Sequence, residues 1–224
     1  CGNAAIVRTD RTADAGITAL CLLAFLGDGH LPDNALDLYR DTVRRAIAWL
    51  LAQQQQDGAF GVNDGPLRFR DGELEAKEPL LMYNHAVATL ALAEAYTLTR
   101  DARLAEPLRR AVRFLADTQQ PEGGWDYFPA TTNRNDTSIT GWVVMALKAA
   151  RSAGVEVPID TVFRSTWHFS RATDSLGRTW YAERGNGVTF NKDTGLPVFR
   201  YGPAMVAVTA FSRQLLGYRT SSPA

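Results

Sequence analysis

The stretch Gln119-Gln120-Pro121-Glu122-Gly123-Gly124-Trp125 decides the fold, because an earlier stretch repeats its pattern. Gln54-Gln55-Gln56-Asp57-Gly58-Ala59-Phe60 has a Gln, a Gly and an aromatic residue at the same spacing. An Arg-Ala pair, followed by an aromatic-Leu pair, precedes both stretches. Internal repeats separated by tens of residues indicate a fold in which similar supersecondary units stack on one another.

Two kinds of apolar segment alternate around these stretches. Segments of the first kind are apolar on nearly all sides and are predicted to form buried helices over residues 14–26, 84–96 and 136–153. Segments of the second kind have one charged face and are predicted to form half-exposed helices beginning at Pro32, over 101–118 and over 158–171. A last helix is expected over 203–216, and a short hairpin is expected to pair 179–182 with 188–191.

The alternation predicts two layers, in which an inner ring of buried helices is covered by an outer ring. Four inner and three outer helices are expected, which makes an open arc. The connection over residues 57–81 is rich in Gly, Pro and charged residues, and a loop of this length is usually functional or inserted. We therefore expect a single, partial domain over residues 1–224 with one long loop at 57–81.

The composition limits which classes of protein this chain can belong to. With 224 residues, of which 46% are hydrophobic, the chain suits one domain with a sizeable core. Its net charge of zero gives no indication of nucleic acid or of an acidic membrane surface as a partner. The longest apolar run, residues 16–27, is too short for a transmembrane segment. Two cysteines do not indicate a disulfide framework, and the oligomeric state is left open.

Cys1 has two interpretations. It is either the lipid-bearing first residue of a processed bacterial lipoprotein, or the first residue of a piece cut from a longer protein. We favour the second interpretation, because the repeat begins in mid-register. The sequence does not indicate a cellular compartment.

The repeated stretches resemble the repeats of the squalene-hopene cyclase and protein prenyltransferase superfamily. Its QW motif, Gln-x3-Gly-x-Trp, is fitted fully by Gln119, Gly123 and Trp125, and a degenerate third copy without the Gln lies over 168–180. The first copy has Phe in place of Trp, and its motif residues are Gln54, Gly58 and Phe60. The resemblance extends from about Thr12 to Leu216. It implies an all-α fold, an incomplete α/α toroid, with a central apolar cavity in which family members hold isoprenoids.

The resemblance also locates the position of the cyclase acid. The family motif Asp-x-Asp-Asp-Thr-Ala corresponds here to residues 133–138, in which Asp136 and Thr137 match and Asn135 stands at the proton donor. An amide has no acidic proton that would protonate an alkene. We therefore do not expect proton-initiated cyclisation by the family route, and whether the chain is an enzyme stays open.

Two other kinds of functional site known from toroid families, a zinc site and a thioester, are not supported by the sequence. Asp136 and Ser138 keep the spacing of the prenyltransferase zinc ligands, but a serine hydroxyl is a poor substitute for the required thiolate. Cys1-Gly2-Asn3-Ala4 has Ala where a thioester needs Gln. We expect no metal and no cofactor.

The candidate site residues each have a structural alternative. Asp136 is the catalytic candidate, and the alternative is an N-cap, which is the more frequent role of Asp before an apolar helix. His85 is a candidate base or ligand, but a single His beside a helix start is more often structural. Aromatic residues stabilise carbocations by cation–π contacts, yet more often they only fill a core. The candidates for lining the cavity are Tyr83, His85, Asn135, Thr137, Trp142 and Tyr201.

The sequence supports two functional hypotheses. The leading hypothesis is a terpenoid cyclase- or prenyltransferase-like domain whose apolar cavity suits an isoprenoid-type ligand and whose acid motif is degraded. The alternative is a non-catalytic repeat scaffold that binds a protein or a glycan through its rim and the loop 57–81.

Overall fold

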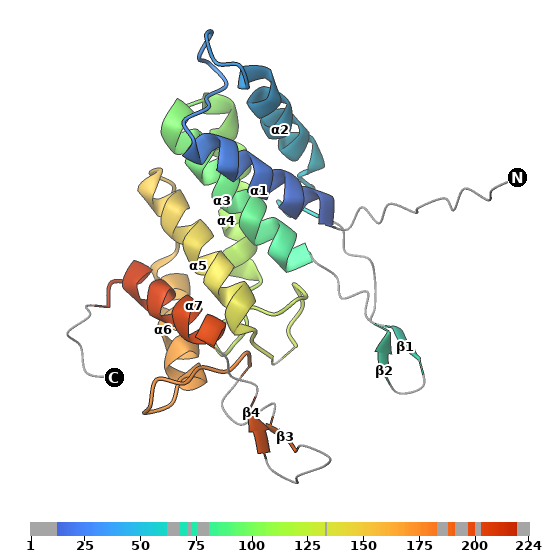
Figure 1. Ribbon diagram of the computed structural model, residues 1–224, viewed down its shortest axis with the longest axis vertical. Coiled ribbons are helices and arrows are strands. Elements are labelled where there is room, and N and C mark those ends of the chain that lie inside the picture. Colours follow the sequence, from blue (N-terminus) through green and yellow to red (C-terminus); the bar gives the residue numbers. More distant parts are fainter. Residues whose placement is uncertain are drawn as a thin grey trace, which may run out of the picture.

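The computed structural model describes residues 13–61, 68–70, 73–75, 81–132, 134–182, 188–190, 197–199 and 203–218. Within these residues the chain forms seven helices and two short hairpins (Figure 1). The helices are α1 (Asp14–Gly27), α2 (Arg40–Gln53), α3 (Leu81–Thr99), α4 (Ala102–Asp117), α5 (Thr137–Ser152), α6 (Ile159–Ala172) and α7 (Pro203–Leu215). The antiparallel hairpins pair β1 (Arg68–Arg70) with β2 (Glu73–Glu75), and β3 (Val188–Phe190) with β4 (Pro197–Phe199).

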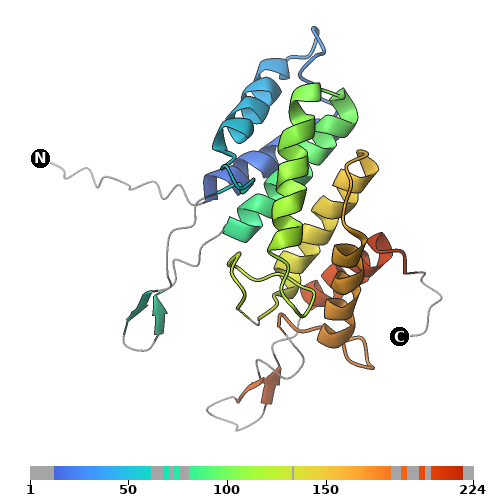
Figure 2. The same cartoon turned by 180° about the vertical axis from the view of Figure 1, so that it is seen from behind.

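The helices form two layers. In the inner layer, α1, α3, α5 and α7 pack against one another in chain order, and the outer layer consists of α2, α4 and α6. The inner helices lie in front of α4 and α6 in Figure 1, and the reverse view in Figure 2 brings α4 and α6 forward. The predictions of an all-α fold and of alternating helices are confirmed. A toroid is not shown by the described residues.

Burial explains why the two kinds of helix alternate. The central inner helix α3 packs against α1, α4 and α5, so most of its residues are buried and its sequence is apolar on nearly every side. The outer helix α4 buries Leu104, Leu108 and Leu115, and its opposite face exposes Arg109 and Arg113. None of the described helices combines the length and the apolar character needed to span a membrane.

The start of α2 differs from the prediction, which placed it at Pro32. Residues 28–39 form turns instead, and the helix begins at Arg40. The Asp37 carboxylate accepts hydrogen bonds from the backbone N–H groups of Leu31 (3.0 Å) and Tyr39 (2.8 Å). An Asp side chain that satisfies nearby backbone groups in this way competes with helix formation, and it therefore keeps this segment in a turn.

The predicted hairpin between 179–182 and 188–191 is wrong. Strand β3 pairs with Pro197–Phe199, whereas Thr179 forms an isolated bridge with Thr173. The cause is a tight turn after α6, in which the N–H of Asp174 donates to the carbonyl of Arg178 (3.0 Å). Beyond this turn the N–H of Trp180 donates to the carbonyl of Ala172 (3.0 Å) and the carbonyl of Tyr181 accepts from the N–H of Thr137 (2.7 Å), so these backbone groups are not available for the predicted pairing.

The two Gln-to-aromatic stretches form equivalent turns after α2 and α4. In the second turn the N–H of Gly123 donates to the carbonyl of Gln120 (2.9 Å), and Gly58 makes the same bond to Gln55 (3.0 Å). Gly123 and Gly58 have φ of +93° and +96°, a region that favours glycine. The family-like spacing of Gln and Gly therefore corresponds to one repeated backbone conformation.

Each of these turns is fixed to the outer helix that follows it. The Gln119 amide donates to the carbonyl of Thr161 on α6 (2.9 Å), as well as to that of Gly123 in its own turn (2.8 Å). The Gln54 amide likewise donates to the carbonyl of Pro107 on α4 (2.8 Å). The glycine allows a close approach, because a Cβ added to Gly123 would lie 2.1 Å from the carbonyl oxygen of Arg164.

The third, degenerate copy forms the same turn, but this turn does not contact a following outer helix among the described residues. Thr173 takes the position of the glutamine, and Gly177 again has a positive φ of +77°. A Cβ added to Gly177 would meet nothing within 4 Å. In the described part of the chain, no outer helix is seated on this turn.

Trp125 closes the second turn over the core. Its side chain is fully buried, and its indole N–H donates to the carbonyl of Leu115 near the end of α4 (2.8 Å). Its backbone N–H donates to the hydroxyl of Thr140 on α5 (3.0 Å). Trp125 therefore joins the outer helix before the turn to the inner helix after it.

The two glycines give a matched test of this close approach. Gly177→Ala introduces only the strain of a positive φ, which costs about 1–2 kcal/mol. Gly123→Ala adds a clash with the backbone of Arg164, so we expect a further loss of roughly 1–3 kcal/mol. The measurement is urea-induced unfolding of both variants. Equal losses would show that the contact with α6 does not restrict residue 123.

Candidate functional site

The first residues of α3 and α5 bring together a polar cluster that includes two of the predicted residues. The hydroxyl of Tyr83 lies 2.5 Å from the hydroxyl of Ser138, which itself donates to the carboxylate of Asp136 (2.5 Å). Because the Ser138 proton is directed at Asp136, the bond between the two hydroxyls requires Tyr83 to donate. Burial raises the pKa of Tyr83 above its usual value of 10.0, which keeps its phenol protonated.

Asp136 is almost completely buried and acts as the N-cap of α5. One carboxylate oxygen accepts from the backbone N–H groups of Ser138 (3.0 Å) and Ile139 (3.1 Å), and the other faces the Arg134 guanidinium (3.4 Å). In all these bonds the carboxylate is an acceptor. The geometry is that of the structural alternative, and it directs no proton toward a substrate.

Arg134 joins this cap to the loop before it. Its guanidinium donates to the buried carboxylate of Asp126 (2.9 Å) and lies over the ring of Tyr127, 5.2 Å from the centroid. The Thr132 hydroxyl donates to the other oxygen of Asp126 (2.7 Å). The sequence analysis missed Asp126 and Arg134 and considered Ser138 only at the position of a zinc ligand, although the Arg between Asn133 and Asn135 was a signal of a cation close to the cap.

Asn135, at the position of the family acid, is fully buried. Its side-chain oxygen accepts from the backbone N–H of Gly124 (2.8 Å) in the second turn. Gly124 leaves no space beside it, because an added Cβ would lie 2.7 Å from that oxygen and 2.9 Å from Nδ1 of His168. Asn135 is therefore packed beneath the turn.

His85 is fully buried between the first turn and α4. The N–H of Phe60 donates to its Nδ1 (3.1 Å), so its Nε2 carries the proton that is donated to the carbonyl of Ala111 (3.0 Å). Burial lowers the pKa of His85 to about 4. The imidazole is consequently neutral at physiological pH, and both nitrogens bond to the backbone.

Thr137 and His168 form a second buried pair. The Thr137 hydroxyl donates to the carbonyl of Trp180 (2.7 Å) and lies 3.2 Å from Nε2 of His168, from which it accepts. Burial, followed by the positive charge of Arg171, lowers the pKa of His168 to about 3. Sequence analysis did not assign His168 this role, although it occupies the aromatic position that Trp49 and Phe114 hold in the other repeats.

Trp142 and Tyr83 differ from the other candidates because they are only half-buried. Both lie on inner helices, and we call the exposed and half-buried apolar side chains of the four inner helices the inner face. Its members come from all four inner helices, and the half-buried Glu94 on α3 is an acidic residue beside them. They are Ile17, Leu20, Tyr83, Leu90, Trp142, Met145, Val206 and Ala207. Tyr201 lies outside the described residues.

A cleft elsewhere on the described surface does not contain the residues of the polar cluster around Asp136. A cleft of about 610 Å³ lies between α2 and the start of α4, and it is lined by Arg44, Ile47, Leu51 and Arg103 among others. None of the predicted cavity residues lines it. Among the described residues, no three His, Cys, Asp or Glu side chains converge as metal ligands.

Comparison with known families identifies one match. The family model of the squalene-hopene cyclase C-terminal domain matches residues 30–136, just under half of the chain. The matched stretch contains α2, α3, α4 and both complete Gln-to-aromatic turns. The resemblance to this family is thus confirmed over 30–136. No curated protein matches the chain.

The cap at Asp136 predicts how its variants behave. Asn caps helices about as well as Asp, so Asp136→Asn should retain most of the stability, whereas Asp136→Ala should cost about 0.5–2 kcal/mol. The measurement is thermal and urea-induced unfolding of both variants. A loss of ligand binding in Asp136→Asn at unchanged stability would instead show that the carboxylate has a functional role.

The two buried histidines predict acid sensitivity. An unfolded histidine titrates near pH 6.5, but the folded values of His85 and His168 are about 4 and about 3. As the pH falls from 6.5 to 4, these histidines become protonated in the unfolded chain while they stay mostly neutral in the folded chain. The free energy of unfolding therefore falls. Each histidine should contribute a loss of up to about 3 kcal/mol at pH 4. Above pH 6.5 this loss is absent.

The control for the acid sensitivity is His168→Phe, which introduces the residue found at Phe114 in the preceding repeat. Urea-induced unfolding at pH 7.5 and pH 4.5 should show a smaller acid loss in this variant than in the original chain. An identical pH dependence in both proteins would contradict the assignment of the loss to His168.

Proposed function

We propose that this chain forms a terpenoid-cyclase-like domain that holds an apolar, isoprenoid-type ligand against its inner face and does not initiate cyclisation with the family acid. The family match over residues 30–136 supports the class of ligand. The inner face supports its location, because Trp142 and Tyr83 lie there beside aliphatic side chains.

The observation that carries this proposal is the apolar character of the inner face. On α1, Leu20 is 47% exposed and Ile17 is 58% exposed. Removing apolar surface from water is favourable by roughly 25 cal/mol per Å², so a hydrocarbon gains by covering these side chains. The π faces of Trp142 and Tyr83 also suit a polyene or a cationic form of it.

The state of the acid motif supports binding rather than protonation. Asn135 replaces the donor and accepts a hydrogen bond from Gly124, while Asp136 caps α5. A general acid must reach the atom that it protonates. In its described hydrogen bonds the Asp136 carboxylate only accepts, and Asn135, an amide, has no carboxyl proton to donate.

A second function is favoured by one observation. His85, Asn135 and Thr137 are fully buried, and their described hydrogen bonds are to groups of the protein itself. Polar residues that serve only the fold suit the alternative of a repeat scaffold, which binds a protein or a glycan through its rim and the loop 57–81. This scaffold would not retain isoprenoids.

The test is retention of squalene by the purified chain, with extraction and mass spectrometry after gel filtration. The original chain should retain squalene and release no cyclised product above background, because Asn135 replaces the acid. Leu20→Asp should reduce retention at least about tenfold, which corresponds to about 1.4 kcal/mol. The exposed position of Leu20 leaves the fold intact, which a melting curve checks.

The matched control is Leu36→Asp, because Leu36 is 96% exposed and lies in the turns before α2, away from the inner face. It should retain squalene like the original chain. Equal retention in both Asp variants would argue against the inner face, and no retention by any of the proteins would favour the scaffold. A hopene-like product would show that another residue supplies the proton.

A further inference from the structure

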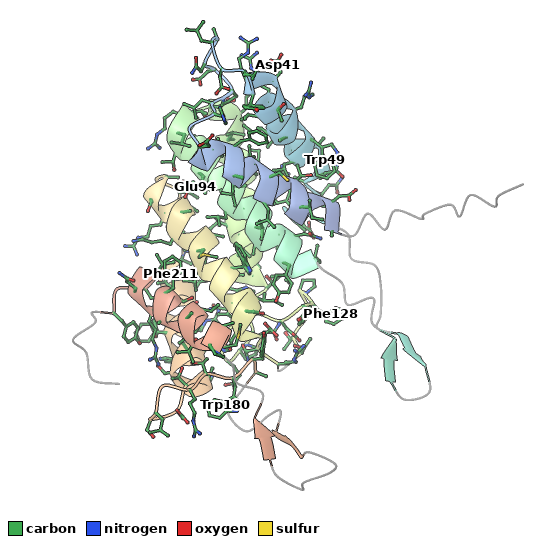
Figure 3. The ribbon with its side chains drawn as sticks, in the orientation of Figure 1. Asp41, Trp49, Glu94, Phe128, Trp180 and Phe211 are labelled. Carbon is green, nitrogen blue, oxygen red and sulfur yellow. The ribbon has the colours of Figure 1, made fainter. Side chains whose placement is uncertain are left out.

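Glu94 is a carboxylate without a partner in the inner layer. It lies on α3, which packs between α1 and α5 (Figure 3). Glu94 is half-buried, and among the described residues it takes part in no hydrogen bond and no ion pair. The other carboxylates that the fold buries differ from it, because Asp126, Asp136 and Asp174 each face an arginine.

Glu94 continues the apolar surface of α3. Between positions 81 and 95, Tyr83, Leu90 and Glu94 are the residues that are not fully buried. They stand seven and four residues apart, so they lie on one side of the helix. With a rise of 1.5 Å per residue, Glu94 lies about 16 Å along the helix axis from Tyr83. The carboxylate therefore stands beyond Leu90 on the same stripe.

A matching stripe runs along α5. The bond between the hydroxyls of Tyr83 and Ser138 places the starts of the two helices side by side, and the helices run in the same direction (Figure 1). Trp142 and Met145 follow Ser138 by four and seven residues and are also half-buried. Together the stripes form a surface that is apolar in its middle and carries Glu94 toward the end of α3.

The basic side chains of the neighbouring segments are directed elsewhere. Lys148 and Arg151 of α5 line a small pocket together with residues of α6 and α7, on the flank of α5 away from α3. The Arg100 guanidinium donates to the carbonyl of Ala153 (2.8 Å) and lies over the ring of Tyr96. Within the described part of the chain, Glu94 is thus left without a cation.

This arrangement makes the charge of a ligand important. A hydrocarbon that covers the inner face removes water from Glu94, and a carboxylate that loses water without gaining a partner is destabilised. A ligand with a positive end replaces the lost water by an ion pair, which is stronger beside apolar groups than in bulk water. A ligand with a negative end is repelled.

We propose that the ligand of the inner face is an amphiphilic amine, whose ammonium group pairs with Glu94 and whose isoprenoid-type tail runs over Leu90 and Met145 toward Trp142. This inference rests on the proposed function, because the tail uses the same inner face, and it adds the charge of the ligand. A metal ion does not fit the position, since one carboxylate supplies too few ligands for it.

The experiment compares three probes that share one tail and differ in their end group: farnesylamine, farnesol and farnesoic acid. Their dissociation constants for the purified 224-residue chain are measured by equilibrium dialysis at neutral pH. Farnesylamine should bind at least about tenfold more tightly than farnesol. Farnesoic acid should bind more weakly than farnesol, because its carboxylate meets Glu94.

Two variants of Glu94 test the ion pair. Glu94→Gln keeps the shape of the side chain without its charge, so the affinity for farnesylamine should fall to that for farnesol. Glu94→Lys should reverse the order and favour farnesoic acid. The melting temperature checks that both variants fold. The matched control is Glu156→Gln, which removes an exposed carboxylate between α5 and α6 and should keep the preference for the amine.

Equal binding of farnesylamine and farnesol by the original chain would overturn the inference, and so would a preference for the amine that survives in Glu94→Gln. If squalene is still retained in either case, the proposed function stands without it. A chain that binds none of the three probes and retains no squalene would overturn the proposed function and this inference together.

Discussion

A single glutamine amide holds each pair of neighbouring repeats together. In the second turn, Gln119 donates to Gly123 in its own turn and to Thr161 on the next outer helix, so one side chain fixes both the turn and its seat. Gly123 then permits the backbones to meet, and the aromatic residue two positions later closes the core. A buried amide that lost one of these acceptors would leave a donor unsatisfied, at a cost of about 1–3 kcal/mol. The layered arrangement depends on this contact.

The same contact explains why several candidate site residues serve the fold. His85 and Asn135 each accept a backbone N–H from one of the turns, at Phe60 and Gly124 respectively. These polar groups are buried because the turns are buried, and a buried donor needs a partner. What remains for a ligand is the apolar inner face, bordered by the polar cluster around Asp136. The chain therefore separates the groups that stabilise the repeats from the surface that suits a hydrocarbon.

Much of the fold was predictable because the hydrophobic period differs between buried and half-exposed helices, as in α3 and α4. The cap of α5 was also predictable, since Asp136 precedes an apolar helix. The start of α2 was not, because Asp37 satisfies nearby backbone groups in a way that helical periodicity does not reveal. The cluster of Asp126, Arg134 and Ser138 depends on a folded loop. Arg134 stands beside the cap in the sequence, but its contact with Asp126 follows no spacing that a sequence pattern would recognise.

The shortest bonds from the two glutamine amides to the receiving helices go to main-chain carbonyls, at Pro107 on α4 (2.8 Å) and at Thr161 on α6 (2.9 Å). Because every residue carries such a carbonyl, these two bonds do not depend on which side chain stands at the accepting position, and the two helices indeed have a proline and a threonine there. Repeats that are joined in this way can be exchanged for one another. A unit that was duplicated, exchanged or extended by a loop as long as 57–81 would still fit its neighbour, provided that the Gln and the Gly of the turn were kept.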